Sequence, residues 1–226
     1  MNVTGDLRYV DPGEYAAFAD RNSVKARDRA FGFDRTAILA RYRRAEPKLG
    51  EAEVRAKWLA DTPLGFVEHR AAWSPTGRYG RWVAGNPAVA LIDGTLFVHG
   101  GLSAAYAGQS LADINRRIAA ALREPADITD PIVEDSAGPL WYRGHGDGSA
   151  PTGELAAVLK AYGARRMVIG HTPVLSGIAV TDDARLIRID TGNSAHYRGQ
   201  PSWLEIVNDV PVAHKVARPA SGGGGQ

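Results

Sequence analysis

The sequence predicts an α/β (α+β) fold in which sheets pack on each other and a helical region lies near the N-terminus. Three observations support this class. Residues 12–82 are polar and rich in arginine and alanine with helical spacing, residues 87–98 have the pattern of a β-hairpin, and residues 177–216 contain two strand–turn–strand patterns. Helices mixed with strands that end in hairpins are typical of sheets covered by helices and by other sheets.

The helical region is expected to be a small subdomain or lid. The segments "KARDRAFGFDRTAILARYRRA" (25–45) and "GEAEVRAKWLADT" (50–62) have helical spacing. In the second, Val54, Trp58 and Leu59 form an apolar stripe beside charged residues. The aromatic residues of the region are expected in its core rather than at a ligand site: Phe31, Phe33, Tyr42 and Trp58.

The hairpin pattern marks a change in character along the chain. Two apolar runs, "AVALI" and "TLFVH", are joined by Asp93-Gly94, a pair that tolerates the positive φ values of a type I′ turn. Helices are expected at 110–124 and 153–163, and the second helix leads into a strand at 166–169.

The last part of the chain predicts two further hairpins, with turns at Asp182-Asp183 and Asn208-Asp209. We expect one domain over residues 1–218, with 12–82 as its helical insertion. The segment "PASGGGGQ" (219–226) is expected to be a flexible tail, because four consecutive glycines cannot offset the entropy of ordering them.

Composition excludes several classes of function. The chain of 226 residues is 44% apolar and 23% charged, with a net charge of +2, which does not indicate nucleic-acid binding. It contains 0 cysteines, which excludes disulfides, thiolate metal sites and thiol nucleophiles.

We recognise neither a signal peptide nor an 18-residue apolar run, so we expect no membrane partner and a cytoplasmic location. The motifs GxxxxGK[ST], GxGxxG and GxSxG are also absent, which weakens nucleotide-hydrolase, dehydrogenase and serine-hydrolase interpretations.

Two histidines follow apolar strands. His99 ends the strand in "LFVHGGLS" (96–103), and His171 follows the strand in "MVIGHTPV" (167–174). Strand ends are rigid places from which to expose an active group, and Gly100 and Gly101 would allow a ligand or another backbone to come close. Imidazoles bind divalent transition metals, although two ligands alone do not hold a metal tightly. From the spacing alone, buried histidines bonded to backbone carbonyls are the favoured alternative.

Arg143, in "GPLWYRG", is a candidate for binding phosphate or carboxylate through paired hydrogen bonds. A structural arginine stacked on Trp141 is the alternative. The nearby His145 has glycine-rich surroundings, which suggest a mobile loop. Asp190 can orient an imidazole or form an Asx-type turn.

The motifs "FVHGGLS", "GPLWYRG", "VIGHTP" and "IDTG" together resemble those of the calcineurin-like metallophosphoesterases, and most closely the bacterial-type Shewanella-like protein phosphatases. The resemblance covers roughly residues 87–200. It implies a β-sandwich flanked by helices and two divalent metal ions, typically iron, zinc or manganese, that activate a hydroxide for attack on phosphorus. It also implies that His99 and His171 are metal ligands and that Arg143 binds the phosphoryl group of a phosphoprotein or a small phosphoester.

The family's first three motifs, of the forms GDxHG, GDxxDRG and GNHE, do not occur in the sequence, so we assign no catalytic acid or base and expect an incomplete metal site. We expect this chain to be the C-terminal portion of a phosphatase, with little activity and impaired folding. Two alternatives remain at this point. One is a non-catalytic binding module, and the other is a single-metal hydrolase that uses His99, His171 and Asp190.

Overall fold

The structure is a computed structural model that describes residues 2–124, 130–181 and 183–217. The chain divides into two compact units, the first comprising residues 1–85 and 122–126 and the second residues 86–121 and 127–226. The expected flexible tail at 219–226 lies outside the described residues. None of the helices in the described part of the chain is both long enough and apolar enough to cross a lipid bilayer.

The first unit is helical, as the sequence predicts. Its helices are α1 (Pro12–Phe18), α2 (Ser23–Phe33), α3 (Arg35–Ala45), α4 (Glu51–Asp61), α5 (Phe66–Trp73) and α6 (Arg78–Val83). Helices α2, α3 and α4 share a core made by Phe31, Ile38, Val54 and Trp58, in which the Phe31 and Trp58 ring centroids are 5.2 Å apart. The predicted stripe on α4 is therefore confirmed at Val54 and Trp58.

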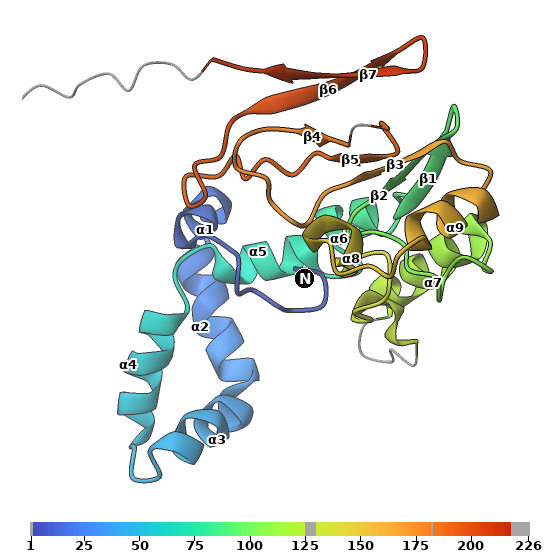
Figure 1. The fold of residues 1–226 in the computed structure, drawn as a ribbon. Helices are drawn as coiled ribbons and strands as arrows, with labels where there is room; N and C mark the ends of the chain where they lie inside the picture. The colour runs from blue at the N-terminus through green and yellow to red at the C-terminus, as the bar shows by residue number, and fades with distance from the viewer. Residues whose placement is uncertain (1, 125–129, 182, 218–226) are drawn as a thin grey trace, which may run out of the picture. The chain divides into compact units, whose positions relative to one another are not determined.

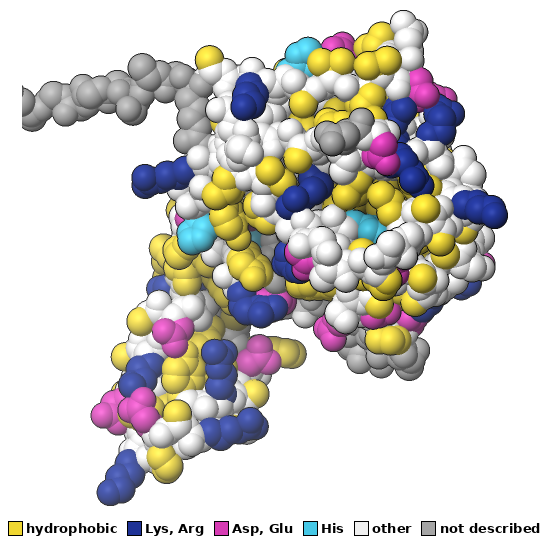
Figure 2. All heavy atoms as spheres, in the orientation of Figure 1, with side chains coloured by type: hydrophobic (Ala, Val, Ile, Leu, Met, Phe, Trp, Pro, Cys, Tyr) yellow, Lys and Arg dark blue, Asp and Glu magenta, His cyan; other side chains and the backbone are white. Residues whose placement is uncertain are grey.

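The expectation for Phe33 is wrong, because 91% of its surface is exposed. Phe31 and Phe33 are two residues apart, and such residues point to different sides of a helix. Around the helices, Lys and Arg side chains alternate with Asp and Glu, as Figure 2 shows, and some of them form surface ion pairs such as Arg35–Glu51 and Arg55–Asp28.

The second unit contains a five-stranded sheet and a two-stranded sheet (Figure 1). Its elements are β1 (Val89–Ile92), β2 (Thr95–Val98), α7 (Leu111–Arg123), a 3-10 helix (Pro131–Val133), α8 (Gly144–Asp147), α9 (Glu154–Ala161), β3 (Arg166–Ile169), β4 (Ala179–Val180), β5 (Leu186–Arg188), β6 (Ser202–Val207) and β7 (Val210–Lys215). The strand order β1-β2-β3-β5-β4 gives a mixed sheet, with β2, β3 and β5 parallel and β1 and β4 antiparallel at its edges.

The predicted turns are confirmed where the structure describes them. Asp93 and Gly94 have φ values of +45° and +70°, and Asn208 and Asp209 have +48° and +69°. Positive φ at both central residues is the signature of the type I′ turn, whose twist matches that of the flanking strands. The third turn includes position 182, which lies outside the described residues.

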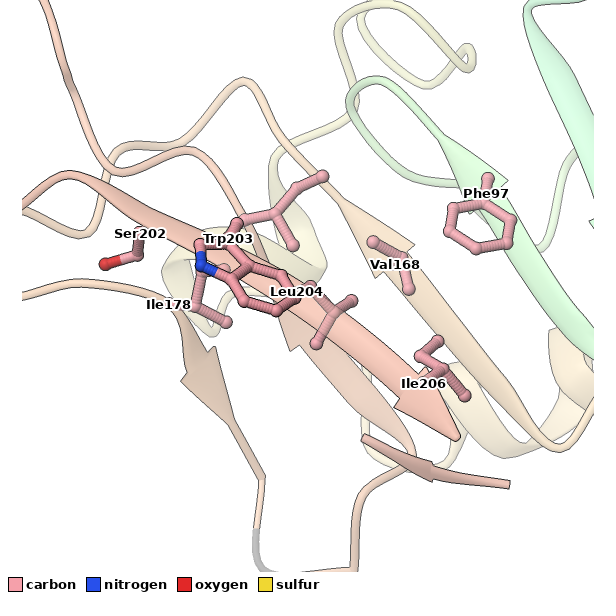
Figure 3. A pocket seen from close by; sticks show the side chains of 8 residues that line it. Phe97, Val168, Ile178, Ser202, Trp203, Leu204 and Ile206 are labelled. Carbon is pink, nitrogen blue, oxygen red and sulfur yellow. The ribbon is translucent and has the colours of Figure 1, made fainter. Parts of the chain in front are cut away.

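The two sheets face each other across a hollow of about 420 Å³ (Figure 3). Phe97 and Val168 line it from the five-stranded sheet, and Leu204 and Ile206 line it from β6. The structure therefore confirms a mixed α/β fold, while the packing of its sheets as a metallophosphoesterase sandwich stays a prediction.

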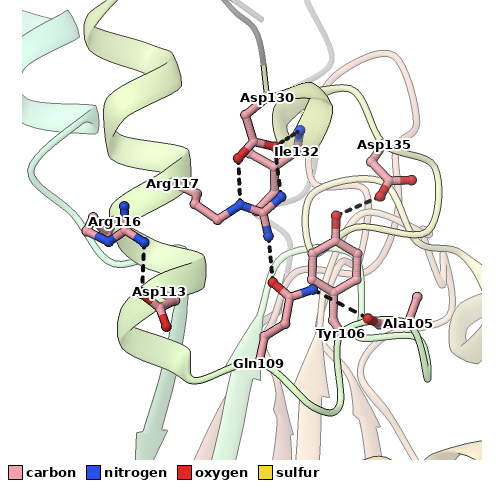
Figure 4. Close-up of polar contacts among 9 residues, drawn as sticks. All are labelled: Ala105, Tyr106, Gln109, Asp113, Arg116, Arg117, Asp130, Ile132 and Asp135. Atoms are coloured by element: carbon pink, nitrogen blue, oxygen red, sulfur yellow. Dashed lines mark hydrogen bonds and ion pairs between the residues drawn. The ribbon is translucent and has the colours of Figure 1, made fainter.

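Polar contacts hold residues 130–135, which precede the "GPLWYRG" motif, in place (Figure 4). Arg117 donates two hydrogen bonds to Asp130, at 2.5 and 2.8 Å, and the Tyr106 hydroxyl donates to Asp135 at 2.6 Å. These contacts tie residues 130–135 to the end of the loop before α7 and to α7 itself.

Gly65 provides a test of the helical unit. It has φ +87°, and a Cβ at this position would overlap the carbonyl oxygen of Tyr15 and lie 2.8 Å from Ala19 N. We predict that Gly65→Ala lowers the free energy of unfolding of this unit by more than about 2 kcal/mol, through steric overlap and left-handed strain. Urea unfolding followed by circular dichroism measures the change.

Gly32→Ala is the matched control, because a Cβ at this helical position meets nothing within 4 Å. We expect it to stabilise α2 by about 0.5–1 kcal/mol. Equal stability changes in the two variants would contradict the packing described for Gly65.

Candidate functional site

The parallel pairing of β2 with β3 brings the two predicted histidines together. In this pairing Val98 lies opposite Ile169, and the ladder continues with a 2.8 Å hydrogen bond from Gly170 N to the His99 carbonyl oxygen. His99 and His171 therefore leave the sheet at the same edge, and their ring centroids are 4.9 Å apart.

His171 has an uncommon backbone conformation. Its φ is +61°, and Thr172 N donates to the Gly170 carbonyl oxygen at 2.6 Å, which makes His171 the central residue of a γ-turn. The form of this turn with positive φ is rare and strained, at a cost of about 1–3 kcal/mol. Such strain is concentrated at functional sites, so the conformation itself marks His171 as a candidate functional residue.

The surroundings of both rings favour the neutral imidazole. Burial, helped by the Arg143 cation and His99, lowers the pKa of His171 from 6.5 to about 4. His99 is partly exposed to solvent, but desolvation by its neighbours still lowers the pKa of its ring. The negative charge of Asp190 only partly opposes this lowering. Neutral rings have a free lone pair at pH 7, which is the form that binds metals.

Arg143 lies beside the histidine pair. Its Nη1 donates to the His171 carbonyl oxygen at 3.1 Å and to Thr172 Oγ1 at 3.4 Å, and its side chain is exposed. Trp141 packs edge-on against the His171 ring, with centroids 5.3 Å apart, while its Nε1 donates to the Val133 carbonyl oxygen at 2.7 Å. The aromatic neighbour thus supports the histidine, a role that the sequence did not suggest.

Asp190 forms the Asx-type turn that the sequence left as one alternative. Its Oδ1 accepts a hydrogen bond from Gly192 N at 3.0 Å. Its negative charge opposes the lowering of the pKa at both imidazoles but does not reverse it. However, no three His, Asp or Glu side chains gather into a group that could hold a metal in the described part of the chain. The described residues therefore give no support for the alternative of a single-metal site made by His99, His171 and Asp190.

The structure also corrects the expectation for His145. The residue is buried in α8, and its Nε2 lies 3.0 Å from the Leu102 carbonyl oxygen. Its ring packs edge-on against Tyr142, with centroids 5.2 Å apart. The glycines around His145 allow close packing rather than mobility, since a Cβ on Gly146 would lie 2.6 Å from Thr172 Oγ1.

The residues present fit part of a metal site. Two neutral imidazoles lie side by side, and the Nε2 atom of His171 is buried with no hydrogen-bond partner, as a ligand nitrogen would be before it binds a cation. Two donors are half of a tetrahedral set. The described residues thus fit two positions of a metal site and do not complete one.

The sequence was compared with protein families and with known proteins. No family model matches the chain. An uncharacterized protein of Schizosaccharomyces pombe is 30% identical over 216 residues, which are 91% of the chain and 52% of that protein. Shewanella-like protein phosphatase 2 of Arabidopsis thaliana is 28% identical over 232 residues, which are 97% of the chain and 57% of that protein. The chain is thus similar in sequence to a named Shewanella-like protein phosphatase.

Solved structures agree with this relationship at the level of the fold. The cold-active protein-tyrosine phosphatase of a psychrophilic Shewanella species has a TM-score of 0.55 and 20% identity, covering 70% of the chain and 47% of that structure. A further cold-active protein tyrosine phosphatase structure has a TM-score of 0.52 and 18% identity, covering 73% of the chain and 51% of that structure. The chain spans about half the length of the curated relatives that it matches.

The low pKa of His171 leads to a prediction. In the metal-free chain, we expect the ring to stay neutral as the pH falls from 7 to 5 and to titrate near pH 4. Histidine titration followed by NMR measures this value. Because the unfolded ring takes up its proton near the ordinary value of 6.5, the folded state should lose stability as the pH falls from 6.5 through 4.

Arg143→Ala is the matched variant. Removing the cation should raise the pKa of His171, because Arg143 is the largest cause of the lowering after burial. A titration near 6.5 in the parent chain, or no upward change in the variant, would contradict the electrostatics described for this site.

Proposed function

We propose that this chain carries part of the active site of a metal-dependent phosphoester hydrolase of the calcineurin-like family. The observation that carries the proposal is the His99–His171 pair, 4.9 Å apart at the ends of adjacent parallel strands, with the Arg143 guanidinium bonded to the His171 carbonyl oxygen. Two imidazoles suit a divalent transition metal, and an exposed guanidinium next to them suits the phosphoryl group.

Each of the three residues has a separate role in the proposal. His99 and His171 hold the metal through neutral ring nitrogens, and Arg143 binds the phosphoryl oxygens and orients the ester. The exposed guanidinium can turn its free N–H groups to the substrate while Nη1 stays near His171. The metal, manganese, iron or zinc in the family, supplies Lewis-acid activation of the phosphoryl group and of water when it is bound.

The substrate in this proposal is a phosphorylated protein or a small phosphomonoester. The Arabidopsis relative is named a protein phosphatase, and the Shewanella structure is named a protein-tyrosine phosphatase. A cationic side chain beside two metal-binding rings favours a dianionic phosphoryl group over a neutral ester.

A non-catalytic binding module is the second candidate. The observation that favours it is the lack, within the described residues, of a third His, Asp or Glu close enough to complete a metal site. Such a module would still bind phosphate through Arg143, but it would not turn the ester over.

We predict that Zn²⁺ perturbs the imidazole resonances of His99 and His171 selectively among the 6 histidines. His99→Ala and His171→Ala should each weaken binding by at least about tenfold, equivalent to about 1.4 kcal/mol, because each removes half of the donor pair. NMR titration of the histidine side chains with Zn²⁺ measures both effects.

His214→Ala is the control for this titration. His214 lies on β7, stacked on Trp203 with ring centroids 4.0 Å apart, and is an imidazole outside the pair. It should leave the Zn²⁺ affinity unchanged. Equal perturbation of all the histidines, or a response of neither His99 nor His171, would remove the basis of the proposed function.

Turnover separates the hydrolase from the binding module. We predict little hydrolysis of p-nitrophenyl phosphate by this 226-residue chain with Mn²⁺, because two imidazoles without a bridging carboxylate cannot hold two metal ions about 3.5–4 Å apart. A colorimetric assay over a range of Mn²⁺ concentrations tests this. Fast turnover that His99→Ala abolishes would show that the site is more complete than the described residues indicate.

A further inference from the structure

The two glycines that follow His99 lie beneath another segment of the chain. Gly100 N donates to the Pro139 carbonyl oxygen at 2.7 Å, and a Cβ on Gly100 would lie 3.0 Å from both the N and O atoms of Tyr142. A Cβ on Gly101 would lie 3.0 Å from the Tyr142 ring. The loop after His99 and the segment 139–143 therefore pack closely, and a side chain at either glycine would push its neighbours apart.

A single carboxylate holds these two segments together. Glu154, at the start of α9, is 9% exposed. Its Oε1 accepts a hydrogen bond from Ala104 N at 2.9 Å, and its Oε2 accepts a short hydrogen bond from the Tyr142 hydroxyl. Each carboxylate oxygen thus serves one segment, and we call this arrangement of Glu154, Tyr142 and Ala104 the Glu154 clamp.

The surroundings keep the clamp in its bonded state. Burial, and then Glu154 itself, raise the pKa of Tyr142, so the phenol remains a hydrogen-bond donor. Gly144 leaves room for the hydroxyl, because a Cβ there would overlap it. The Tyr142 ring also packs edge-on against the His145 ring, with centroids 5.2 Å apart. Hydrogen bonds to a buried carboxylate are stronger than those between neutral groups.

We propose that Glu154 is a positioning residue that places Arg143 beside the histidine pair. Arg143 directly follows Tyr142, so the clamp fixes the backbone from which the guanidinium reaches the His171 carbonyl oxygen at 3.1 Å. The histidines have their own support in the β2–β3 ladder, through the bond from Gly170 N to the His99 carbonyl oxygen. Glu154 therefore sets the position of the Arg143 side chain, whereas the β2–β3 ladder sets the positions of the two imidazoles. The inference concerns geometry, and it goes beyond the proposed hydrolysis because it requires no bound metal.

The test uses three variants of the clamp. Glu154→Ala removes both acceptors, and Tyr142→Phe removes only the phenol donor. Glu154→Gln is the conservative variant, since its amide oxygen can accept from Ala104 N and its amide nitrogen can donate to the Tyr142 hydroxyl oxygen. Tyr106→Phe is the matched control, because it removes a phenol that donates to a different carboxylate, Asp135, at 2.6 Å (Figure 4).

The first measurement is amide hydrogen exchange without ligand. In Glu154→Ala and Tyr142→Phe we expect Gly100 N–H to exchange at least about tenfold faster, while Gly170 N–H keeps its rate. Glu154→Gln and Tyr106→Phe should keep both rates close to those of the parent chain. Unchanged Gly100 exchange in both clamp variants, or equal acceleration at Gly100 and Gly170, would overturn the proposal, because the second result describes general loosening.

The second measurement is the binding of inorganic phosphate, followed at the Arg143 side-chain resonance. We expect binding to weaken about tenfold in Glu154→Ala and to recover in Glu154→Gln, while Zn²⁺ still perturbs His99 and His171 as in the parent chain. Loss of both responses together would assign Glu154 a purely structural role and overturn the proposal. If phosphate does not affect Arg143 in the parent chain, the phosphate role in the proposed function fails, while the exchange rates still decide the clamp.

Discussion

The parallel hydrogen-bonded register of β2 and β3 is the constraint on which the candidate site depends. It places Val98 opposite Ile169, and the next bond joins Gly170 N to the His99 carbonyl oxygen at 2.8 Å. A slip of one residue would send alternate side chains to the other face of the sheet and separate the rings. All four residues of β3 are buried, so the pairing that brings the two rings together lies within the core of the sheet.

Local patterns in the sequence were sufficient to predict much of this arrangement. Asp93-Gly94 predicted a hairpin because the pair tolerates positive φ, and both residues have it. The apolar runs before His99 and His171 predicted buried strands, and the structure pairs them. The rule that strand ends expose active groups made both histidines candidates, and the family resemblance implied that they bind metal together; the structure adds that their strands are parallel neighbours. The turn and the strands could be predicted because each depends on neighbours within a few residues, whereas the pairing of the two strands does not.

The rest depends on contacts between distant residues, for which the sequence has no local signal. Glu154 meets Tyr142 and Ala104, which are 12 and 50 residues away in the chain. The glycine-rich surroundings of His145 suggested mobility, whereas glycines in a packed core permit close approach of neighbouring atoms. Phe33 is the opposite case: it was expected in a core, but it lies on the outer side of its helix and is exposed. Whether a side chain is buried depends on which other residues pack against it, and the composition of a segment does not show which residues these are.

The most direct test of this account is the proximity of the two imidazoles in the metal-free chain. Ring centroids 4.9 Å apart should give nuclear Overhauser cross-peaks between the ring protons of His99 and His171. The stacked rings of His214 and Trp203, with centroids 4.0 Å apart, provide a positive control in the same spectrum. We predict a cross-peak for both pairs. A cross-peak for His214 and Trp203 alone, with His99 and His171 both assigned, would show that the β2–β3 register does not bring the two rings together.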